Sequence, residues 1–501
     1  MTGKVWLVGA GPSDPGLFTL KGQKVLKKAE VVVYDALVGN GVLAMIPSSA
    51  ELIYVGKRAS NHTMVQEEIN RVLVEQAKLG KQVVRLKGGD PFLFGRGGEE
   101  LELLVKEKIP YEVVPGVTSA LSVPAYNGIP VTHRDYCSSL HIITGHKKKD
   151  EEYDIDFEAL VRTEGTLIFL MGVSALEEIC NRLILAGMDK MMPAAILQKG
   201  TTSKQKRIVA TVETLPDEVK RQGVETPAII VVGKVCKLSK QFEWYEKLPL
   251  AGKKILVTRP KELVSKMAEK LREQGAEVLE LPAVDTVPIV PNEKLKDALL
   301  AMETYQWLAF TSPSGVKIFF DLLKQYSMDI RKLGTVKIAA IGEGTKKALK
   351  QYGVFADLMP EQYDGEALGE ALVRECKIGD RILLPRAKIG NKKLIEIIEQ
   401  AQIHVDDIPT YETISCEHAW IDEKEEIEHG GIDYAVFTSA SIVKAFGKVT
   451  KGIDYSKVKA VCIGSKTKAE ADLLGMQTFM SKEATMDSIV ERILDLELNE
   501  I

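Results

Sequence analysis

The sequence predicts an α/β protein built from several domains. Short apolar runs, typical of buried strands, alternate with amphipathic segments, typical of helices, along almost the whole chain. The 501 residues are too many for a single hydrophobic core. A hydrophobic fraction of 45% and a charged fraction of 27% are the ordinary balance of a globular protein. We therefore expect stacked α/β layers repeated in successive domains.

The first half contains two sets of predicted strands, separated by a proline-containing break near residues 115–130. The first set comprises Lys4–Val8, Val31–Tyr34, Leu52–Val55 and Gln82–Leu86, and the second comprises Leu140–Thr144, Thr166–Met171, Ala194–Leu197 and Ala228–Val232. Thr63 and Gln66 have the spacing of a capping box and predict a helix that runs to about Leu79. The two sets predict two α/β lobes, at about 1–117 and 118–240.

A polar segment with aromatic residues, Lys237–Lys254, separates the two halves, and we expect a linker at 241–252. The second half contains an internal repeat. Trp307–Phe319 is echoed by Tyr434–Phe446, and Lys337–Leu349 is echoed by Lys459–Ala471. Because the copies are too far apart for a solenoid, they predict two similar α/β domains. Each copy is a strand followed by a turn and a helix, whose exposed N–H groups suit an anion.

Charge, cysteines and hydropathy exclude several classes of protein. A net charge of −4 argues against a general nucleic-acid binder, and no apolar run reaches the ~20 residues of a membrane span. The chain opens with a strand and a loop and lacks the pattern of a signal peptide. The six cysteines contain no C-x-x-C pair, and the histidines have no metal-site spacing. We expect a cytoplasmic protein without a metal ion.

The stretch Arg85–Glu100 carries the strongest local signal for a ligand site. Two glycines, Gly88 and Gly89, let a ligand approach the backbone, but Asp90 next to them would repel a phosphate. A ligand with amino or hydroxyl groups is therefore favoured. A dinucleotide site is the alternative, because Gly9-Ala10-Gly11 follows a strand and Asp35 closes the next one. Asp14 stands where the third glycine of that fingerprint belongs, which weakens this alternative.

Six ordered motifs in the first half carry a family resemblance. They are VGAGPSDPGLFTLKG (Val8–Gly22), VVVYDALV (Val31–Val38), GGDPFLFGRGGEE (Gly88–Glu100), VPGVTSALSVPAYNGIPVTHR (Val114–Arg134), TLIFLMGV (Thr166–Val173) and ILQKGTT (Ile196–Thr202). In this order they resemble the tetrapyrrole methylases, and specifically uroporphyrinogen-III C-methyltransferase. Ser13 departs from the pattern, because the family usually has glycine there. The resemblance implies a two-lobed fold over 1–240, S-adenosylmethionine bound between the lobes and converted to S-adenosylhomocysteine, and a homodimer through this half.

The resemblance also implies site residues. Family contacts to the methyl donor fall on Pro12, Gly88, Gly89, Asp90, Leu93, Thr118, Ser119, Met171 and Gly200. Asp35 and Lys57 match the positions assigned to proton transfer, where a carboxylate accepts a proton or stabilises a cation and a lysine donates a proton or binds a substrate carboxylate. Candidates for binding the carboxylates of the porphyrinogen are Arg58, Arg85, Arg96 and Arg134. The alternative roles are structural: a helix cap for Asp35, a solvated Lys57, strand core for Met171 and a plain turn for Gly200.

The second half resembles uroporphyrinogen-III synthase over about 250–501. The matching motifs are ILVTRP (Ile255–Pro260), FTSPSGV (Phe310–Val316), AAIGEGT (Ala339–Thr345), LLPRA (Leu383–Ala387), PTYET (Pro409–Thr413), FTSAS (Phe437–Ser441) and IGSKT (Ile463–Thr467). The family fold implies two domains on a two-strand hinge, one at about 253–285 with 412–501 and the other at 286–411. Tyr411 matches a tyrosine that assists the leaving hydroxyl, or packs as a hinge aromatic, and Thr467 matches a threonine near the substrate. Residues implied to hold carboxylates are Arg259, Thr311, Ser312, Arg386, Lys388, Thr438 and Ser439.

Together the two resemblances predict a bifunctional enzyme of tetrapyrrole biosynthesis. The second half would close hydroxymethylbilane to uroporphyrinogen III, and the first half would methylate that product twice to precorrin-2. Alternatives are a methylase of a later corrinoid, or a non-catalytic protein that responds to S-adenosylmethionine. Whether the product leads to siroheme or to cobalamin, and whether the intermediate is channelled, stays open at this point.

Overall fold

The computed structural model describes residues 2–56, 64–145, 155–258, 261–281, 284–390, 392–415, 421 and 423–499. The chain forms two compact units. Unit 1 comprises Met1–Leu281 and His418–Ile501, and unit 2 comprises Pro282–Glu417. Among the described residues, unit 1 contains three sheets and unit 2 contains a fourth. The predicted α/β class is confirmed.

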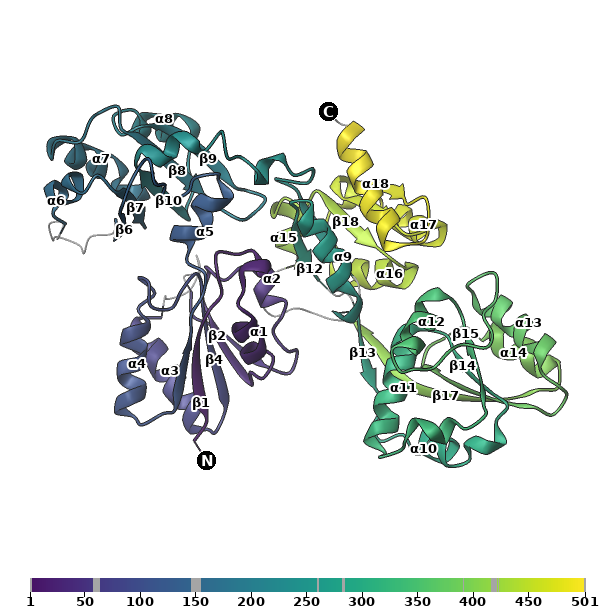
Figure 1. Cartoon of the computed structure of the whole chain (residues 1–501). Coiled ribbons are helices and arrows are strands. Elements are labelled where there is room, and N and C mark those ends of the chain that lie inside the picture. The colour runs from purple at the N-terminus through teal and green to yellow at the C-terminus, as the bar shows by residue number, and fades with distance from the viewer. Residues whose placement is uncertain are drawn as a thin grey trace. The chain divides into compact units, whose positions relative to one another are not determined.

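Lobe one of the first half is a parallel sheet in the order β3-β2-β4-β1-β5 with helices on both faces (Figure 1). The strands are β1 (Lys4–Gly9), β2 (Val31–Tyr34), β3 (Glu51–Tyr54), β4 (Gln82–Lys87) and β5 (Tyr111–Val114). The helices are η1 (Pro15–Leu17), α1 (Leu20–Leu26), α2 (Asn40–Leu43), α3 (Gln66–Lys78) and α4 (Gly97–Lys106). The core under α1 and α2 contains Leu86, and the core under α3 and α4 contains Val83, as alternation along β4 requires.

Lobe two has a mixed sheet in the order β6-β7-β10-β8-β9, in which β10 is antiparallel to both of its neighbours. The strands are β6 (Leu140–Thr144), β7 (Thr166–Leu170), β8 (Pro193–Gln198), β9 (Lys206–Thr211) and β10 (Ala228–Val232). The helices are α5 (Ser119–Tyr126), α6 (Phe157–Arg162), η2 (Val173–Ala175), α7 (Leu176–Leu185), α8 (Leu215–Gln222) and η3 (Lys234–Leu238). Helices α6, α7 and α8 pack on one face, and α5 and η3 pack on the other.

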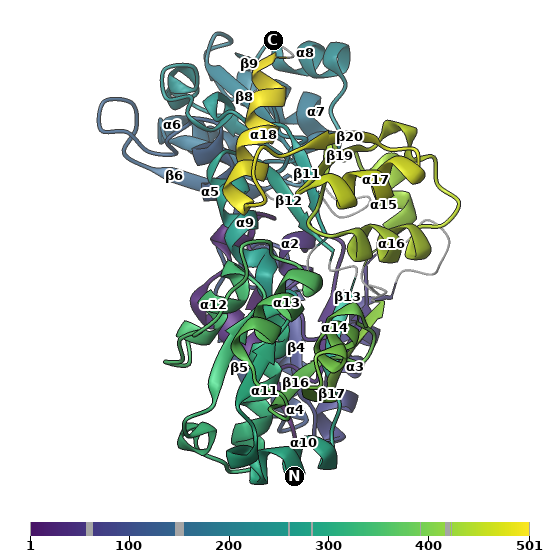
Figure 2. The same ribbon diagram turned by 90° about the vertical axis from the view of Figure 1, so that its right-hand side faces the viewer.

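The third sheet joins the start and the end of the second half in the parallel order β12-β11-β18-β19-β20. Figure 2 labels β11, β12, β19 and β20 of this sheet. The strands are β11 (Lys254–Val257), β12 (Glu277–Glu280), β18 (Tyr434–Phe437), β19 (Lys459–Cys462) and β20 (Gln477–Met480). The helices are η4 (Tyr245–Lys247), α9 (Lys261–Glu273), α15 (Glu423–His429), α16 (Ala440–Val449), η7 (Tyr455–Lys457), α17 (Ser465–Leu473) and α18 (Met486–Asn499). Its core packs α9 and α18 against β11 and β18.

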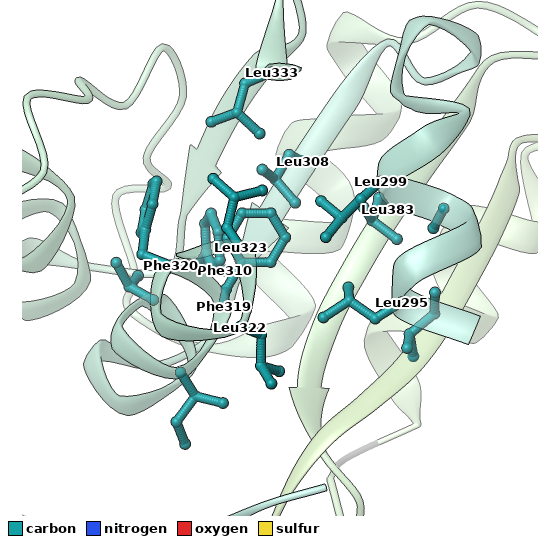
Figure 3. Packing of buried hydrophobic residues seen from close by; sticks show 14 of the residues in the cluster. Leu295, Leu299, Leu308, Phe310, Phe319, Phe320, Leu322, Leu323, Leu333 and Leu383 are labelled. Atoms are coloured by element: carbon teal, nitrogen blue, oxygen red, sulfur yellow. The ribbon is translucent and has the colours of Figure 1, made fainter. Parts of the chain in front are cut away.

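Unit 2 has a sheet in the order β13-β17-β16-β14-β15, in which β13 is antiparallel and the other strands are parallel. The strands are β13 (Val284–Pro288), β14 (Trp307–Phe310), β15 (Lys337–Ala340), β16 (Arg381–Ala387) and β17 (His404–Ser415). The helices are α10 (Glu293–Leu300), η5 (Met302–Thr304), α11 (Pro313–Gln325), η6 (Ile330–Leu333), α12 (Glu343–Lys350), α13 (Gly365–Glu375) and α14 (Lys393–Gln400). Phe310, Phe319 and Phe320 form the centre of its core with surrounding leucines (Figure 3).

The backbone confirms the internal repeat of the second half. Ser312, between β14 and α11, has φ −162° and ψ 153°, and Ser439, between β18 and α16, has φ −163° and ψ 154°. Each serine Oγ accepts a hydrogen bond from the backbone of its own helix, so both are N-caps. The next turns, at Gly342 and Gly464, have φ −177° and −174°. The two domains therefore share a strand–turn–helix unit to within a few degrees.

One local feature differs from the sequence expectation. Helix α3 begins at Gln66, and its N-cap is Val65, whose N–H donates to Glu68 Oε2 at 3.1 Å. The predicted capping box on Thr63 and Gln66 is wrong, because Val65 is the N-cap, Gln66 is the first residue of the helix and Glu68 is the residue that reaches back to the cap. Thr63 lies outside the described residues. In addition, the segment expected to be a linker packs on lobe two, where Trp244 Nε1 donates to the Ala125 carbonyl at 2.9 Å.

Three glycines mark the point where β1, β4 and β5 end. A Cβ on Gly116 would lie 2.2 Å from the carbonyl oxygen of Gly89, and a Cβ on Gly9 would lie 2.5 Å from Gly116 Cα. No side chain fits at either position without moving the backbone of a neighbouring strand end. The close approach of these strand ends therefore requires glycine.

We predict that Gly116→Ala lowers the stability of the first half by about 1–3 kcal/mol through overpacking. Gly98→Ala is the control, because a Cβ at this helical position meets no atom of the described chain within 4 Å. This control should raise stability by about 0.5–1 kcal/mol. Thermal denaturation of the full chain measures both. Equal melting temperatures for Gly116→Ala and the wild type would contradict the packing argument.

Candidate active sites

The loop after β1 lies against the loop after β4. The backbones of Gly11 and Gly89 exchange two hydrogen bonds, at 3.2 and 2.8 Å. Asp14 caps η1 by accepting from Gly16 N at 2.7 Å, and it also accepts from the Tyr126 hydroxyl at 2.7 Å. Asp14 is thus a structural acceptor, which explains its presence where a dinucleotide site would need glycine. Ser13 has φ 119°, a backbone conformation that suits the glycine usual in the family.

Asp90 uses its carboxylate to organise the same region. Oδ1 accepts from Phe92 N at 2.8 Å and from Leu93 N at 3.1 Å, and Oδ2 accepts from Gly116 N at 3.0 Å. One side chain thereby ties the loop after β4 to the end of β5. A carboxylate that accepts several backbone N–H bonds is held firmly in one orientation. Asp90 shapes the glycine loop, whichever group of a ligand it also contacts.

Lobe two contributes the other predicted cofactor residues. Thr118 caps α5 by accepting from Ala120 N at 3.3 Å, and Ser119 is the first residue of that helix. Gly200 lies so close to α5 that a Cβ would meet Val123 at 2.4 Å. Met171 follows β7 with φ 56° and is 53% exposed, so it is not strand core. Leu93, from lobe one, packs on the hydrophobic core of lobe two.

A cavity of about 360 Å³ brings together three of the predicted cofactor residues, Pro12, Ser119 and Gly200. The Pro12 carbonyl accepts from Thr201 Oγ1 at 2.9 Å, which joins the two lobes at the cavity wall. Leu37 lines the cavity and also blocks any Cβ at Gly88, at 2.5 Å. The described lining does not include six other predicted cofactor residues, Gly88, Gly89, Asp90, Leu93, Thr118 and Met171.

Asp35 follows β2 and is held from two sides. Its Oδ1 accepts from Leu37 N at 3.1 Å, and its Oδ2 accepts from Arg85 Nη2 at 3.1 Å. Arg85 is only 3% exposed, so it lies behind Asp35 and not on a surface open to a substrate. Lys87 and Glu100, which the sequence analysis did not single out, complete the cluster around Arg85. Lys57 and Arg58 lie outside the described residues.

The remaining arginines of the first half have different surroundings. Arg96 is the αL residue that precedes α4, with φ 57°, and its guanidinium binds Glu99 through two bonds of 2.8 and 2.6 Å. Arg134 is exposed in the turn after α5. Both are more accessible than Arg85.

In unit 2, Tyr411 lies on β17 and is 5% exposed. Its hydroxyl lies 2.8 Å from Ser312 Oγ, the N-cap of α11, which also accepts from Gly315 N at 2.9 Å. Burial raises the pKa of Tyr411, and the bond to Ser312 opposes the rise in part. The phenol therefore stays protonated at neutral pH and is directed at a helix N-terminus.

The basic candidates of the second half are paired. Arg386 is buried and holds Asp407 through two bonds of 2.6 and 2.8 Å. Lys388 binds Glu412. Arg259 lies outside the described residues. A substrate carboxylate at Arg386 would have to displace a bidentate partner, which makes Arg386 a better anchor for β16 and β17 than a free binding group.

The hydroxyl candidates of the second half occupy equivalent places in the two copies of the repeat. Thr311 and Ser312 follow β14, and Thr438 and Ser439 follow β18. Thr467 is buried in the first turn of α17. Thr345, which the sequence analysis did not select, occupies the same place in α12 and is also buried. The repeat itself was the signal that could have identified it.

Two further observations limit what the sites contain. Within the described residues, no group of three or more His, Cys, Asp or Glu side chains could hold a metal ion. No helix of the described chain is long and apolar enough to cross a membrane.

The two-lobed first half and the duplicated second half define a protein made of two successive α/β enzymes. Residues 4–216 match the family "Tetrapyrrole (Corrin/Porphyrin) Methylases", and residues 265–491 match "Uroporphyrinogen-III synthase HemD". The "Porphyrin biosynthesis protein HemD" of Ruminiclostridium josui is 46% identical over 99% of this chain and 98% of its own length. The chain belongs to this family of porphyrin-biosynthesis proteins, in which a methylase and a synthase are joined.

Other similar proteins match a part of the chain. A "Uroporphyrinogen-III C-methyltransferase" of Bacillus subtilis is 41% identical over 70% of this chain and 72% of its own length. The solved uroporphyrin-III C-methyl transferase of Thermus thermophilus, complexed with S-adenyl homocysteine, is 40% identical, with a TM-score of 0.41, over 47% of this chain and 99% of its own. As a member of its families, the protein is a bifunctional enzyme of tetrapyrrole biosynthesis, with an S-adenosylmethionine-dependent methyltransferase half and a synthase half.

We predict that Asp90→Ala lowers the stability of the first half by about 1–3 kcal/mol, because three backbone N–H groups lose their acceptor. S-adenosylmethionine affinity should fall with it, since the glycine loop is no longer tied to Gly116. Thermal denaturation and isothermal titration calorimetry measure the two effects, with the exposed Asp135→Ala as the control. Weaker binding at an unchanged melting temperature would instead indicate that Asp90 acts only by touching the donor.

Proposed function

We propose that the synthase half closes hydroxymethylbilane to uroporphyrinogen III and that the methylase half then methylates this product twice to give precorrin-2. The observation that carries the proposal is the presence of both enzymes in one chain, matched from end to end by a porphyrin-biosynthesis relative. The product of one half is then the substrate of the other. This continuity also favours the early porphyrinogen over a later corrinoid as the methyl acceptor.

Asp35 is our candidate for proton chemistry among the described residues of the methylase half. Methylation of a pyrrole carbon puts positive charge on the ring, and a proton must then leave. A carboxylate held by Arg85 and by a backbone N–H keeps one orientation while it stabilises that charge or accepts that proton. Pro12, Ser119 and Gly200 line the cavity that we assign to the methyl donor.

Tyr411 is the candidate acid of the synthase half. Loss of the terminal hydroxyl from hydroxymethylbilane requires a proton donor, and a buried phenol with a raised pKa keeps its proton. Ser312 fixes the direction of the phenol from the α11 N-terminus. The cap turns at Ser312 and Ser439 offer N–H and hydroxyl groups to substrate carboxylates.

We further propose that the enzyme works in the cytoplasm as a homodimer through its methylase half and without nucleic acid. Free cysteines in the described chain, such as buried Cys180 and Cys236, suit a reducing compartment. Sedimentation velocity of the full chain tests the dimer.

The proposed function predicts labelled precorrin-2 from hydroxymethylbilane and methyl-labelled S-adenosylmethionine. Two methyl groups should enter each product. Unlabelled uroporphyrinogen III as the only product would refute the methylase assignment, and label entering only supplied uroporphyrinogen III would refute the synthase assignment.

Asp35→Asn should lower methyl transfer by about 10²–10⁴-fold and leave ring closure unchanged.

Tyr411→Phe should lower the ring-closure rate by at least about tenfold, because the proton donor is lost. Burial raises the pKa of Tyr411, so in the wild type its phenol stays protonated and imposes no alkaline fall in rate between pH 7 and 9. Initial rates at each pH test this. A fall near pH 8 that disappears in Tyr411→Phe would contradict the raised pKa, and full activity of Tyr411→Phe would leave the tyrosine a packing role.

A further inference from the structure

A cluster of buried charges lies behind Asp35, at the carboxyl end of β4. Arg85 and Lys87 project from the strand face that carries Val83 in the core under α3 and α4. Glu100, on α4, is 0% exposed and lies between them. Buried ions need partners, and Glu100 is the counter-charge that both cations share, at 3.1 Å from Arg85 and 2.9 Å from Lys87.

Glu100 makes its bonds asymmetrically. Its Oε1 accepts from Arg85 Nε at 3.1 Å, from Lys87 Nζ at 2.9 Å and from Gln66 Nε2 at 3.3 Å. Its Oε2 is buried and has no hydrogen-bond partner in the described chain. Leaving one carboxylate oxygen unpaired in the core is costly. The unpaired Oε2 therefore lowers the stability of the cluster. The bonds to Oε1 hold the Arg85 and Lys87 side chains in fixed orientations.

Arg85 connects Glu100 to Asp35, because its guanidinium is hydrogen-bonded to both carboxylates. Its Nε is bound by Glu100, its Nη2 donates to Asp35 Oδ2, and its Nη1 donates to the Leu86 carbonyl at 3.0 Å. Every nitrogen of the planar guanidinium is therefore engaged, and the group bridges a buried carboxylate and a part-exposed one. Without Glu100, Nε would lose its acceptor, and the guanidinium beside Asp35 would be oriented only by its Nη1 bonds to the Leu86 and Val33 carbonyls, at 3.0 and 3.4 Å.

The same neighbours also affect the pKa of Lys87. Burial lowers its pKa, the Arg85 charge lowers it further, and Glu100 opposes both effects. If Glu100 lost its charge, two cations would remain buried against the single carboxylate of Asp35. Glu100 therefore has two separable roles: it neutralises the buried positive charge, and it orients the Arg85 guanidinium.

We propose that Glu100 is a positioning residue for methyl transfer: through Arg85 it holds the Asp35 carboxylate in the orientation that the reaction needs. This inference rests on the role of Asp35 proposed above. It also gives Arg85 a role other than binding substrate carboxylates, in agreement with its burial.

The test is a double-mutant cycle on the full chain with Glu100→Gln, Asp35→Asn and the pair. Methyl transfer from labelled S-adenosylmethionine to uroporphyrinogen III is measured as kcat and KM, with active sites counted by S-adenosylmethionine binding. Glu100→Gln should lower kcat by about 10–100-fold with KM changed less than threefold, because a small misplacement of a reacting group costs about that much. In the Asp35→Asn background it should have little further effect.

Two controls separate positioning from folding. Glu102→Gln, on the exposed side of α4, should leave kcat unchanged. Glu100→Gln combined with Lys87→Met removes the surplus buried cation, so it should recover melting temperature while kcat stays low. The ring-closure rate of the synthase half should be unchanged in every variant.

The outcomes are distinct. Normal kcat per binding site in Glu100→Gln, additive effects of Glu100→Gln and Asp35→Asn, or recovery of kcat together with melting temperature in the Lys87→Met combination would each overturn the inference. Full methyl transfer by Asp35→Asn would overturn the proposed role of Asp35 and the inference with it. Loss in Asp35→Asn with additivity would overturn only the inference.

Discussion

Three strand ends of lobe one meet so closely that Gly9 and Gly116 have no room for a side chain, and the loops that we propose for the methyl donor depend on that constraint. Gly9, Gly89 and Gly116 bring β1, β4 and β5 within backbone contact. Asp90 then ties the β4 loop to Gly116, and Gly11 pairs with Gly89. The loop after β1, which lines the cavity that we assign to the donor, and the loop after β4, which does not line it, thus start from one rigid point. A site built on such a junction is organised before a ligand arrives, which lowers the entropy lost on binding.

Much of this fold could be predicted because its signals are local. Strands such as Val31–Tyr34 and Ala228–Val232 occupy the predicted residues, since apolar runs and turn residues lie next to each other in sequence. The direction of side chains at the site could not be predicted in the same way. The sequence suggested that Asp90 faces a ligand; it did not indicate that the carboxylate also binds three backbone N–H groups, one of them 26 residues away.

The acidic partners of the buried arginines could not be predicted either, because they lie far away in the sequence. Arg85 and Arg386 have the chemistry of carboxylate binders, but both are buried against acidic residues of their own chain, Glu100 and Asp407. Composition shows that an arginine is present and says nothing about which carboxylate it meets. The repeat of the second half was more informative, because one copy predicts the geometry of the other, as Thr345 and Thr467 show.

The way unit 2 is joined to the chain has a consequence for its evolutionary origin. The chain enters unit 2 near β13 and leaves it near the end of β17, and the antiparallel ladder places Val284 opposite Ser415. Because entry and exit are neighbours, unit 2 is an insertion that leaves the surrounding sheet intact. Taken with the shared turn geometry, this connectivity fits a duplicated domain whose second copy was inserted into the first. If unit 2 were expressed alone, its two ends would lie next to each other, because Val284 pairs with Ser415. Neighbouring termini are also the condition under which circular permutation is tolerated.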